Sequence, residues 1–143
     1  MKNTKKVLLL SLVAIVIIVI SDSSFCQEKD FKNIIGKEWK VVEIKGNKLN
    51  ETELENGYPK IIFGENNKLT GFTGCNTFSG TFKVEDSNIS LDPGVMTKMM
   101  CGDDIEMRLL SAIKNITKWK FADKKLELTN TAKTVLTLVL VNE

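Results

Sequence analysis

The sequence contains no histidine among its 143 residues. Without an imidazole, the chain cannot form a Ser-His-Asp or Cys-His catalytic site, or a zinc site with histidine ligands. Only two prolines are present, which leaves little room for a linker between domains. The basic residues are scattered, so the clustered positive charge that nucleic-acid binding requires is missing as well. These absences favour one small domain that is not an enzyme and does not bind nucleic acid.

Long hydrophobic runs are scarce too. The longest covers residues 7–20 and holds 14 residues, fewer than the roughly 18 to 20 that a membrane-spanning helix needs. Three lysines precede it and a short stretch with small residues follows it, which is the layout of a secretory signal peptide. An uncleaved anchor helix is the alternative.

Cys26 lies where a bacterial lipoprotein carries its lipidated cysteine. The lipidation signal would place leucine three residues earlier and a small residue just before, but Ser23 and Phe25 occupy these positions. Ordinary cleavage after Cys26 is therefore favoured, and lipidation of Cys26 is the alternative. The predicted organisation is a signal peptide over residues 1–26, a short linker over residues 27–33 and a domain over residues 34–143.

Cleavage would lower the formal net charge from +2 to 0 and would leave two of the three cysteines. An even pair of cysteines in an oxidising compartment favours a disulfide. A bond between Cys75 and Cys101 would close a loop of 27 residues, worth roughly 3 to 4 kcal/mol in the chain-entropy description. We expect an exported monomer in the periplasm or at the outer membrane, attached to a membrane only if Cys26 is lipidated.

Alternation of apolar and polar residues indicates strands in most of the domain. One segment has helical periodicity instead: Ile105, Leu109, Leu110, Ile113 and Ile116 fall along one stripe, and Asp103 or Asp104 is the expected N-cap. The fold class predicted is mainly β (α+β), an antiparallel, barrel-like curled sheet of seven or eight short strands with one helix packed on or in it. The expected strands lie within residues 38–46, 60–64, 68–74, 77–85, 89–92, 118–122, 125–129 and 134–141.

The segment "TGFTGCNTFSGTF" (70–82) is the most distinctive stretch of the domain. It lacks the phosphate-loop pattern G-x-x-x-x-G-K-[ST], and Cys75 has no base nearby in the sequence. Gly74 permits a bend or a close approach of strands, and Asn76 tolerates a turn conformation. We predict a structural turn at Gly74 and Asn76, not a catalytic site.

Three further ideas have weaker support, and we predict no catalytic, cofactor or metal residues. Soft ligands could bind Cu(I), but the methionines could equally fill the core beneath the helix. Four acids could form a calcium site, although helix capping explains most of them. Aromatic side chains could line a ligand cup or simply pack in the core. The copper set is Cys75, Met96, Met99, Met100 and Cys101; the calcium set is Asp92, Asp103, Asp104 and Glu106; the aromatic set is Trp39, Phe78, Phe82, Trp119 and Phe121.

Several landmarks together resemble the META domain family, which includes HslJ-type heat-shock proteins of the bacterial envelope. They are Trp39 in the first strand, "PKIIF" (59–63), "GFTGCNTFSGTF" (71–82), "TKMMC" (97–101) and Glu106 with "LLSAIKNI" (109–116). The Gly-Cys-Asn followed by Thr-Lys-Met-x-Cys is the most specific of these. The resemblance covers about residues 34–141.

The resemblance implies a compact β-rich domain with one helix, similar in some members to the lipid-binding pilotins of secretion systems. It also implies a life in the envelope, links to heat or envelope stress and, in some members, novobiocin resistance. Cys75 and Cys101 fall on the two cysteine positions of the family, and no catalytic residues follow from it. We therefore expect a non-enzymatic envelope protein that acts through an unknown envelope partner or supports envelope integrity. The alternative is a carrier of a small apolar or lipid-like ligand.

Overall fold

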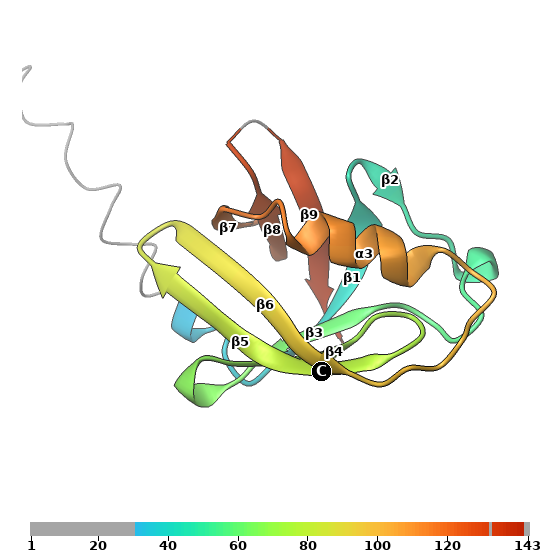
Figure 1. The fold of residues 1–143 in the computed structure, drawn as a ribbon. Coiled ribbons are helices and arrows are strands. Elements are labelled where there is room, and N and C mark those ends of the chain that lie inside the picture. Colours follow the sequence, from blue (N-terminus) through green and yellow to red (C-terminus); the bar gives the residue numbers. More distant parts are fainter. Residues whose placement is uncertain (1–30, 132, 142–143) are drawn as a thin grey trace, which may run out of the picture.

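The computed structural model of the protein describes residues 31–131 and 133–141. The expected signal peptide and Cys26 lie outside these residues. The described part forms one antiparallel sheet of nine strands, joined by short turns and one α-helix (Figure 1). The strands are β1 (Glu38–Ile44), β2 (Asn47–Lys48), β3 (Lys60–Phe63), β4 (Lys68–Phe72), β5 (Thr77–Glu85), β6 (Asn88–Met96), β7 (Lys118–Ala122), β8 (Lys125–Thr129) and β9 (Thr134–Leu140).

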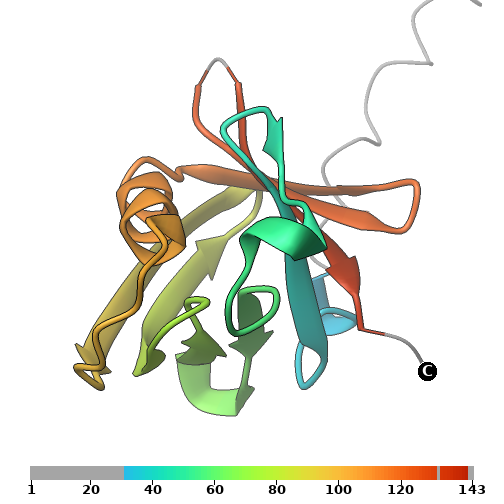
Figure 2. The ribbon, with the colours of Figure 1, turned by 90° about the vertical axis from the view of Figure 1, so that its right-hand side faces the viewer.

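The first and last long strands pair with each other, so the sheet closes into a ring (Figure 2). Trp39 of β1 lies opposite Ile61 of β3 on one side and opposite Leu140 of β9 on the other. The ring is weakest between β6 and β7, where Asn88 and Lys118 form the single pair. Helix α3 (Ile105–Ile113) packs against β1, β6 and β9, beside this weak joint.

The core fills the inside of the ring, because alternate residues of each strand point inward. On β5 these are Phe78 and Phe82, as the alternation predicted. An aromatic cluster occupies the centre: the ring of Phe31 lies 4.9 Å from Trp119 and 5.6 Å from Phe63, both edge-on. Edge-on aromatic pairs add to the free energy gained from burial alone.

Helix α3 is amphipathic, with Ile105, Leu109, Ala112 and Ile113 buried. The stripe predicted from the sequence differs at one position, since Leu110 is only half-buried. Of the two expected N-cap residues, Asp104 occupies the N-cap position but its side chain makes no capping hydrogen bond. The backbone N–H of Ile105 donates instead to the carboxylate of Asp103 over 3.1 Å.

The predicted fold class is confirmed, with differences in detail. The two-residue β2 adds a ninth strand, because a strand this short carries no alternation that a sequence could reveal. Strand β6 continues through Pro93 and Gly94 to Met96, beyond its expected end. Phe31, expected in the linker, is a buried member of the core. In the described part of the chain, no helix is long and apolar enough to cross a membrane.

Candidate functional site

The connection between β4 and β5 is a tight turn from Thr73 to Asn76. The backbone N–H of Thr73 donates to the carbonyl of Asn76 over 2.8 Å, and the Thr73 hydroxyl accepts from the N–H groups of Cys75 and Asn76. Gly74 has a φ of +101°, and a Cβ placed there would lie 2.4 Å from Cγ2 of Ile105. Only glycine satisfies both the backbone angle and the close approach of the helix.

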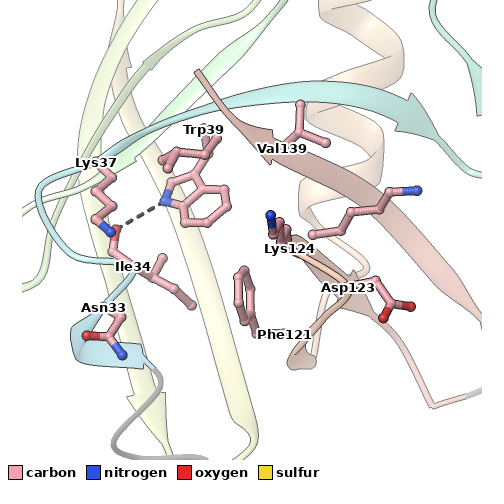
Figure 3. A pocket seen from close by; sticks show the side chains of 10 residues that line it. Asn33, Ile34, Lys37, Trp39, Phe121, Asp123, Lys124 and Val139 are labelled. Atoms are coloured by element: carbon pink, nitrogen blue, oxygen red, sulfur yellow. Dashed lines mark hydrogen bonds between the residues drawn. The ribbon is translucent and has the colours of Figure 1, made fainter. Parts of the chain in front are cut away.

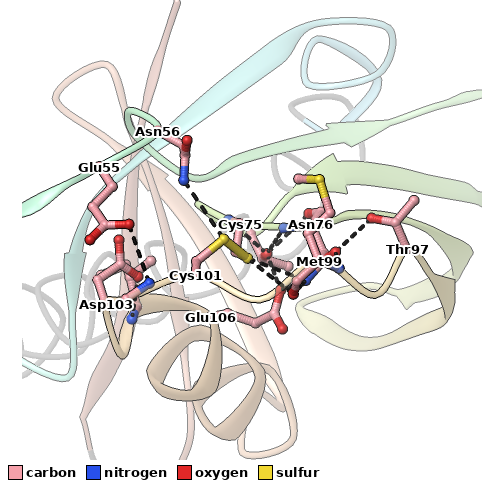
Figure 4. Close-up of a disulfide and its surroundings, with 12 residues drawn as sticks. Glu55, Asn56, Cys75, Asn76, Thr97, Met99, Cys101, Asp103 and Glu106 are labelled. Atoms are coloured by element: carbon pink, nitrogen blue, oxygen red, sulfur yellow. Dashed lines mark hydrogen bonds between the residues drawn. A yellow bond between two sulfur atoms is a disulfide. The ribbon is translucent and has the colours of Figure 1, made fainter.

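Asn76 connects this turn to the segment that leads into α3 (Figure 4). Its side chain is 2 % exposed, and all four of its hydrogen-bonding positions are used. The amide nitrogen donates to the Met99 carbonyl over 3.1 Å and to Glu106 Oε2 over 3.0 Å. The amide oxygen accepts from the Thr97 hydroxyl over 2.8 Å and from the Met99 N–H over 2.7 Å.

Glu106 completes the network from the first turn of α3. Its Oε2 accepts hydrogen bonds from the hydroxyl of Thr73 and from the amide of Asn76. From the sequence, Glu106 was considered as one of four possible calcium ligands and as a landmark of the family resemblance, and its hydrogen bonds to the turn were not predicted. Its position in "TKMMCGDDIE", close behind the second cysteine, was the one signal that could have linked it to the turn.

The disulfide joins the same two segments. Cys75 and Cys101 are bonded, and their Cα atoms lie 5.9 Å apart, within the range that a disulfide bridges. Cys75 is buried, and the side-chain amide of Asn56 lies 3.7 Å from Cys101 Sγ on the other side. We call this set the corner network: Thr73, Gly74, Cys75, Asn76, Thr97, Met99, Cys101 and Glu106. Its polar groups bond to one another, so its geometry fits a fastening between turn and helix.

The geometry of the described residues gives little support to a copper or a calcium site. In the described residues, no three cysteine, aspartate or glutamate side chains gather where they could share a metal ion. Both thiols that the copper idea needs are in the disulfide. The interpretation that the methionines fill the core is wrong for two of them, because Met99 is 60 % exposed and Met100 is fully exposed. The hydrogen bonds of Asn76 to the Met99 backbone hold this segment at the surface.

A second feature is a pocket of about 520 Å³ at one open end of the ring, which we call the mouth pocket (Figure 3). Ile34, Trp39 and Phe121 face one another across it. The Trp39 and Phe121 rings meet edge-on with centroids 6.0 Å apart, and Trp39 Nε1–H donates to the Ile34 carbonyl over 3.1 Å. Phe121 is 43 % exposed, whereas Ile34 and Trp39 are buried beneath it. The lining residues are Asn33, Ile34, Lys37, Trp39, Phe121, Asp123, Lys124, Lys125, Val139 and Leu140.

The aromatic set predicted from the sequence therefore divides in two. Trp39, Phe78, Phe82 and Trp119 are all buried in the core, although Trp39 also lies in the wall of the mouth pocket, whereas Phe121 is exposed there. Core packing therefore holds for four of the five residues, and a ligand cup at Phe121 stays a prediction. Sequence reasoning missed the lysines of the pocket, because they lie far apart in the chain and belong to no motif.

In the middle of β7, an ion pair joins Lys120 to Glu127 of β8 with 2.9 Å between Nζ and Oε2. This lysine, with the Thr134 hydroxyl, holds the pKa of Glu127 below its ordinary value despite partial burial. A lowered carboxylate pKa next to a lysine is what a structural ion pair produces.

These features define a small antiparallel β protein with one helix, one disulfide and an open apolar pocket. The family model of the META domain matches residues 32–143, so the chain belongs to the META domain family. The family that the sequence resembles is thereby confirmed.

Three solved structures share the fold. One, titled only as the NMR structure of a protein, is 24% identical with a TM-score of 0.59, covering 76% of this chain and 92% of the other. An NMR structure of a protein from Burkholderia xenovorans is 17% identical, with a TM-score of 0.63 and coverage of 80% and 88%. The crystal structure of a DUF4847 family protein from Bacteroides vulgatus is 14% identical, with a TM-score of 0.58 and coverage of 78% and 96%. No curated protein matches the chain.

Proposed function

We propose that this protein is an exported, non-enzymatic binding protein of the cell envelope, and that its mouth pocket receives a small apolar or lipid-like molecule. The observation that carries the proposal is the pocket itself. At about 520 Å³ it falls within the usual range of small-molecule sites, and its accessible apolar lining comes from Phe121 with half-buried Val139 and Leu140, above the buried Ile34 and Trp39. An aromatic ring left 43 % exposed at its edge is a surface that a ligand could cover.

The absence of enzymatic activity is part of the proposal and rests on how the reactive groups are used. The thiol of Cys75, the natural nucleophile of the turn, is bonded to Cys101. The carboxylate of Glu106 accepts from Thr73 and Asn76 inside the corner network. The chain has no histidine that could act as a general base at neutral pH. A hydrolase or transferase activity abolished by one carboxylate substitution would contradict this part.

Export also remains a proposal, supported by the layout of residues 1–26. The intact mass of the protein purified from the envelope fraction tests it. We expect the mass of a chain beginning at Gln27 and lacking two hydrogens, because the remaining cysteines are bonded. Added acyl mass on a chain beginning at Cys26 would identify a lipoprotein instead, and the full-length mass would contradict export by cleavage.

Binding is tested with N-phenyl-1-naphthylamine, an uncharged dye that fluoresces in apolar surroundings. We expect the protein to take up the dye, and Phe121→Ala to weaken its affinity about tenfold, because the variant removes one wall of the pocket. Met107→Ala is the matched control, since Met107 is also an exposed apolar side chain but lies outside the mouth pocket. The proposal fails if the dye is not taken up, or if both variants bind it as the unchanged protein does.

A further inference from the structure

The edge of the mouth pocket carries an excess of positive charge. Three lysines line it: Lys37 from the segment before β1, Lys124 from the turn between β7 and β8, and Lys125 from the start of β8. Asp123 is the one acidic side chain of the lining, so the pocket has a net charge of +2. The formal charge of the chain without residues 1–26 is 0, so this excess is local.

Few basic side chains of the described residues are held in ion pairs with acids. Lys60 pairs with Glu38 over 2.7 Å, Lys120 with Glu127 over 2.9 Å and Arg108 with Asp104 over 3.6 Å. Lys37 and Lys124 make no such ion pair within that part of the chain. Both side chains are exposed, and Figure 3 shows them beside the apolar group of Ile34, Trp39 and Phe121.

An apolar pocket with a cationic edge is complementary to a molecule with an apolar chain and an anionic head. The chain would cover Phe121 and the accessible parts of Val139 and Leu140 and gain free energy from the burial of apolar surface. The head would stay in water at the edge, where Lys37 and Lys124 attract it without the cost of burying a charge. A cationic head would be repelled, so charge gives the pocket a means of discrimination.

We propose, building on the proposed function, that the mouth pocket selects anionic amphiphiles, in which Lys37 and Lys124 hold a carboxylate or phosphate head. Because the lysines are exposed, the contribution of each is modest and sensitive to salt. The contribution of the apolar lining is not sensitive to salt in this way. Affinity and charge selectivity can therefore be measured separately.

The test compares four ligands with the same ten-carbon apolar chain, namely undecanoate, decyl phosphate, 1-decanol and decyltrimethylammonium, each below its micelle concentration. Displacement of N-phenyl-1-naphthylamine reports the affinity. We expect the two anions to bind about five- to tenfold more tightly than decanol at low salt, and the cation more weakly than decanol. Raising the salt to physiological strength shortens the screening length to about 8 Å and should reduce the advantage of the anions. The preferred anion then tells a carboxylate source from a phosphate source.

The variants assign the selectivity to particular residues. Lys37→Gln and Lys124→Gln should each weaken the binding of the anions about two- to fivefold and leave decanol unchanged. Asp123→Asn should strengthen the binding of the anions, because it removes the one negative charge. Lys83→Gln, an exposed lysine of β5 outside the pocket, should change nothing.

The outcomes separate the two proposals. Equal affinity for anions and decanol, or selectivity that survives loss of both lysines, overturns the charge assignment and leaves an apolar binding protein. If none of the four ligands displaces the dye and the dye itself does not bind, the proposed function fails as a whole.

Discussion

Replacing Gly74 by alanine tests whether the turn before β5 fastens the start of the helix. The new Cβ would lie 2.4 Å from Cγ2 of Ile105, whereas carbon atoms in contact prefer about 3.5 to 4.0 Å. Something must therefore shift by more than an ångström, at a cost of about 1 to 3 kcal/mol for overpacking. The φ of +101° adds about 1 to 2 kcal/mol, because a Cβ disfavours that region. The total expected loss is about 2 to 5 kcal/mol.

Gly46 provides the matched control. It has a φ of +83°, but a Cβ there would meet nothing within 4 Å. Gly46→Ala should thus show the cost of the backbone angle alone, about 1 to 2 kcal/mol. The difference between the two variants measures the contact with Ile105.

Urea unfolding followed by tryptophan fluorescence gives the free energies of unfolding, and equal slopes show that the midpoints can be compared. A second comparison uses Ile105→Leu, which lacks the γ2 methyl group and keeps the size of the side chain. In that background, Gly74→Ala should cost about as much as Gly46→Ala does. If Gly74→Ala costs no more than Gly46→Ala in the unchanged chain, or if Ile105→Leu brings no relief, the close packing of turn and helix is refuted.

Three further changes test the disulfide, the hydrogen bonds and the ion pair. Reduction of the Cys75–Cys101 bond should lower the free energy of unfolding by about 3 to 4 kcal/mol, the amount expected for a sequence separation of 26. A thiol titration of the folded protein that finds both thiols free would contradict the bond. Asn76→Ala should lower the free energy of unfolding by about 2 to 4 kcal/mol, because the Met99 backbone groups lose their hydrogen-bond partners. A urea midpoint within error of that of the unchanged protein would show that water replaces the amide. Glu127→Gln should cost less than about 1 kcal/mol at neutral pH. In the folded protein the pKa of Glu127 is lowered from 4.5. The stabilisation by the carboxylate is therefore present above that pH and disappears as the pH falls through the lowered pKa. A stability difference between Glu127→Gln and the unchanged protein that grows in acid would refute the assignment.

Local patterns of the sequence predicted the strands and the helix well. Alternation placed Phe78 and Phe82 on the inner face of β5, and helical periodicity placed Leu109 and Ile113 in the core. The sequence predicted that the sheet curls into a barrel, but not which strands close the ring, because the pairing of Trp39 with Leu140 joins the two ends of the domain. No local pattern specifies a pairing across so many residues.

The candidate sites show the same limit. The turn at Gly74 and Asn76 was predictable, since glycine and asparagine carry their conformational preferences locally. The hydrogen-bond partners of Asn76 were not predictable, because Met99 contributes its backbone N–H and carbonyl, and backbone groups leave no signal in a sequence. The mouth pocket was expected only as one of two roles for Trp39 and Phe121, and its charge depends on side chains brought together by the ring.

The corner network and the mouth pocket have no residue in common, and this separation decides how loss of binding can be interpreted. The corner network uses the disulfide and the buried Asn76 to hold the chain between β4 and α3. The mouth pocket is formed by the segment before β1, the turn between β7 and β8 and the adjacent ends of β1, β7, β8 and β9. Strand β7 is joined to β6 through the single pair of Asn88 and Lys118. Substitutions of exposed side chains in the pocket remove little of the buried core, so they should change affinity while leaving the midpoint of unfolding nearly unchanged. A ligand, in turn, should raise the stability by an amount set by its concentration relative to its dissociation constant. Variants of the pocket should lose that ligand-dependent gain, whereas variants of the corner network should retain it on a lower baseline.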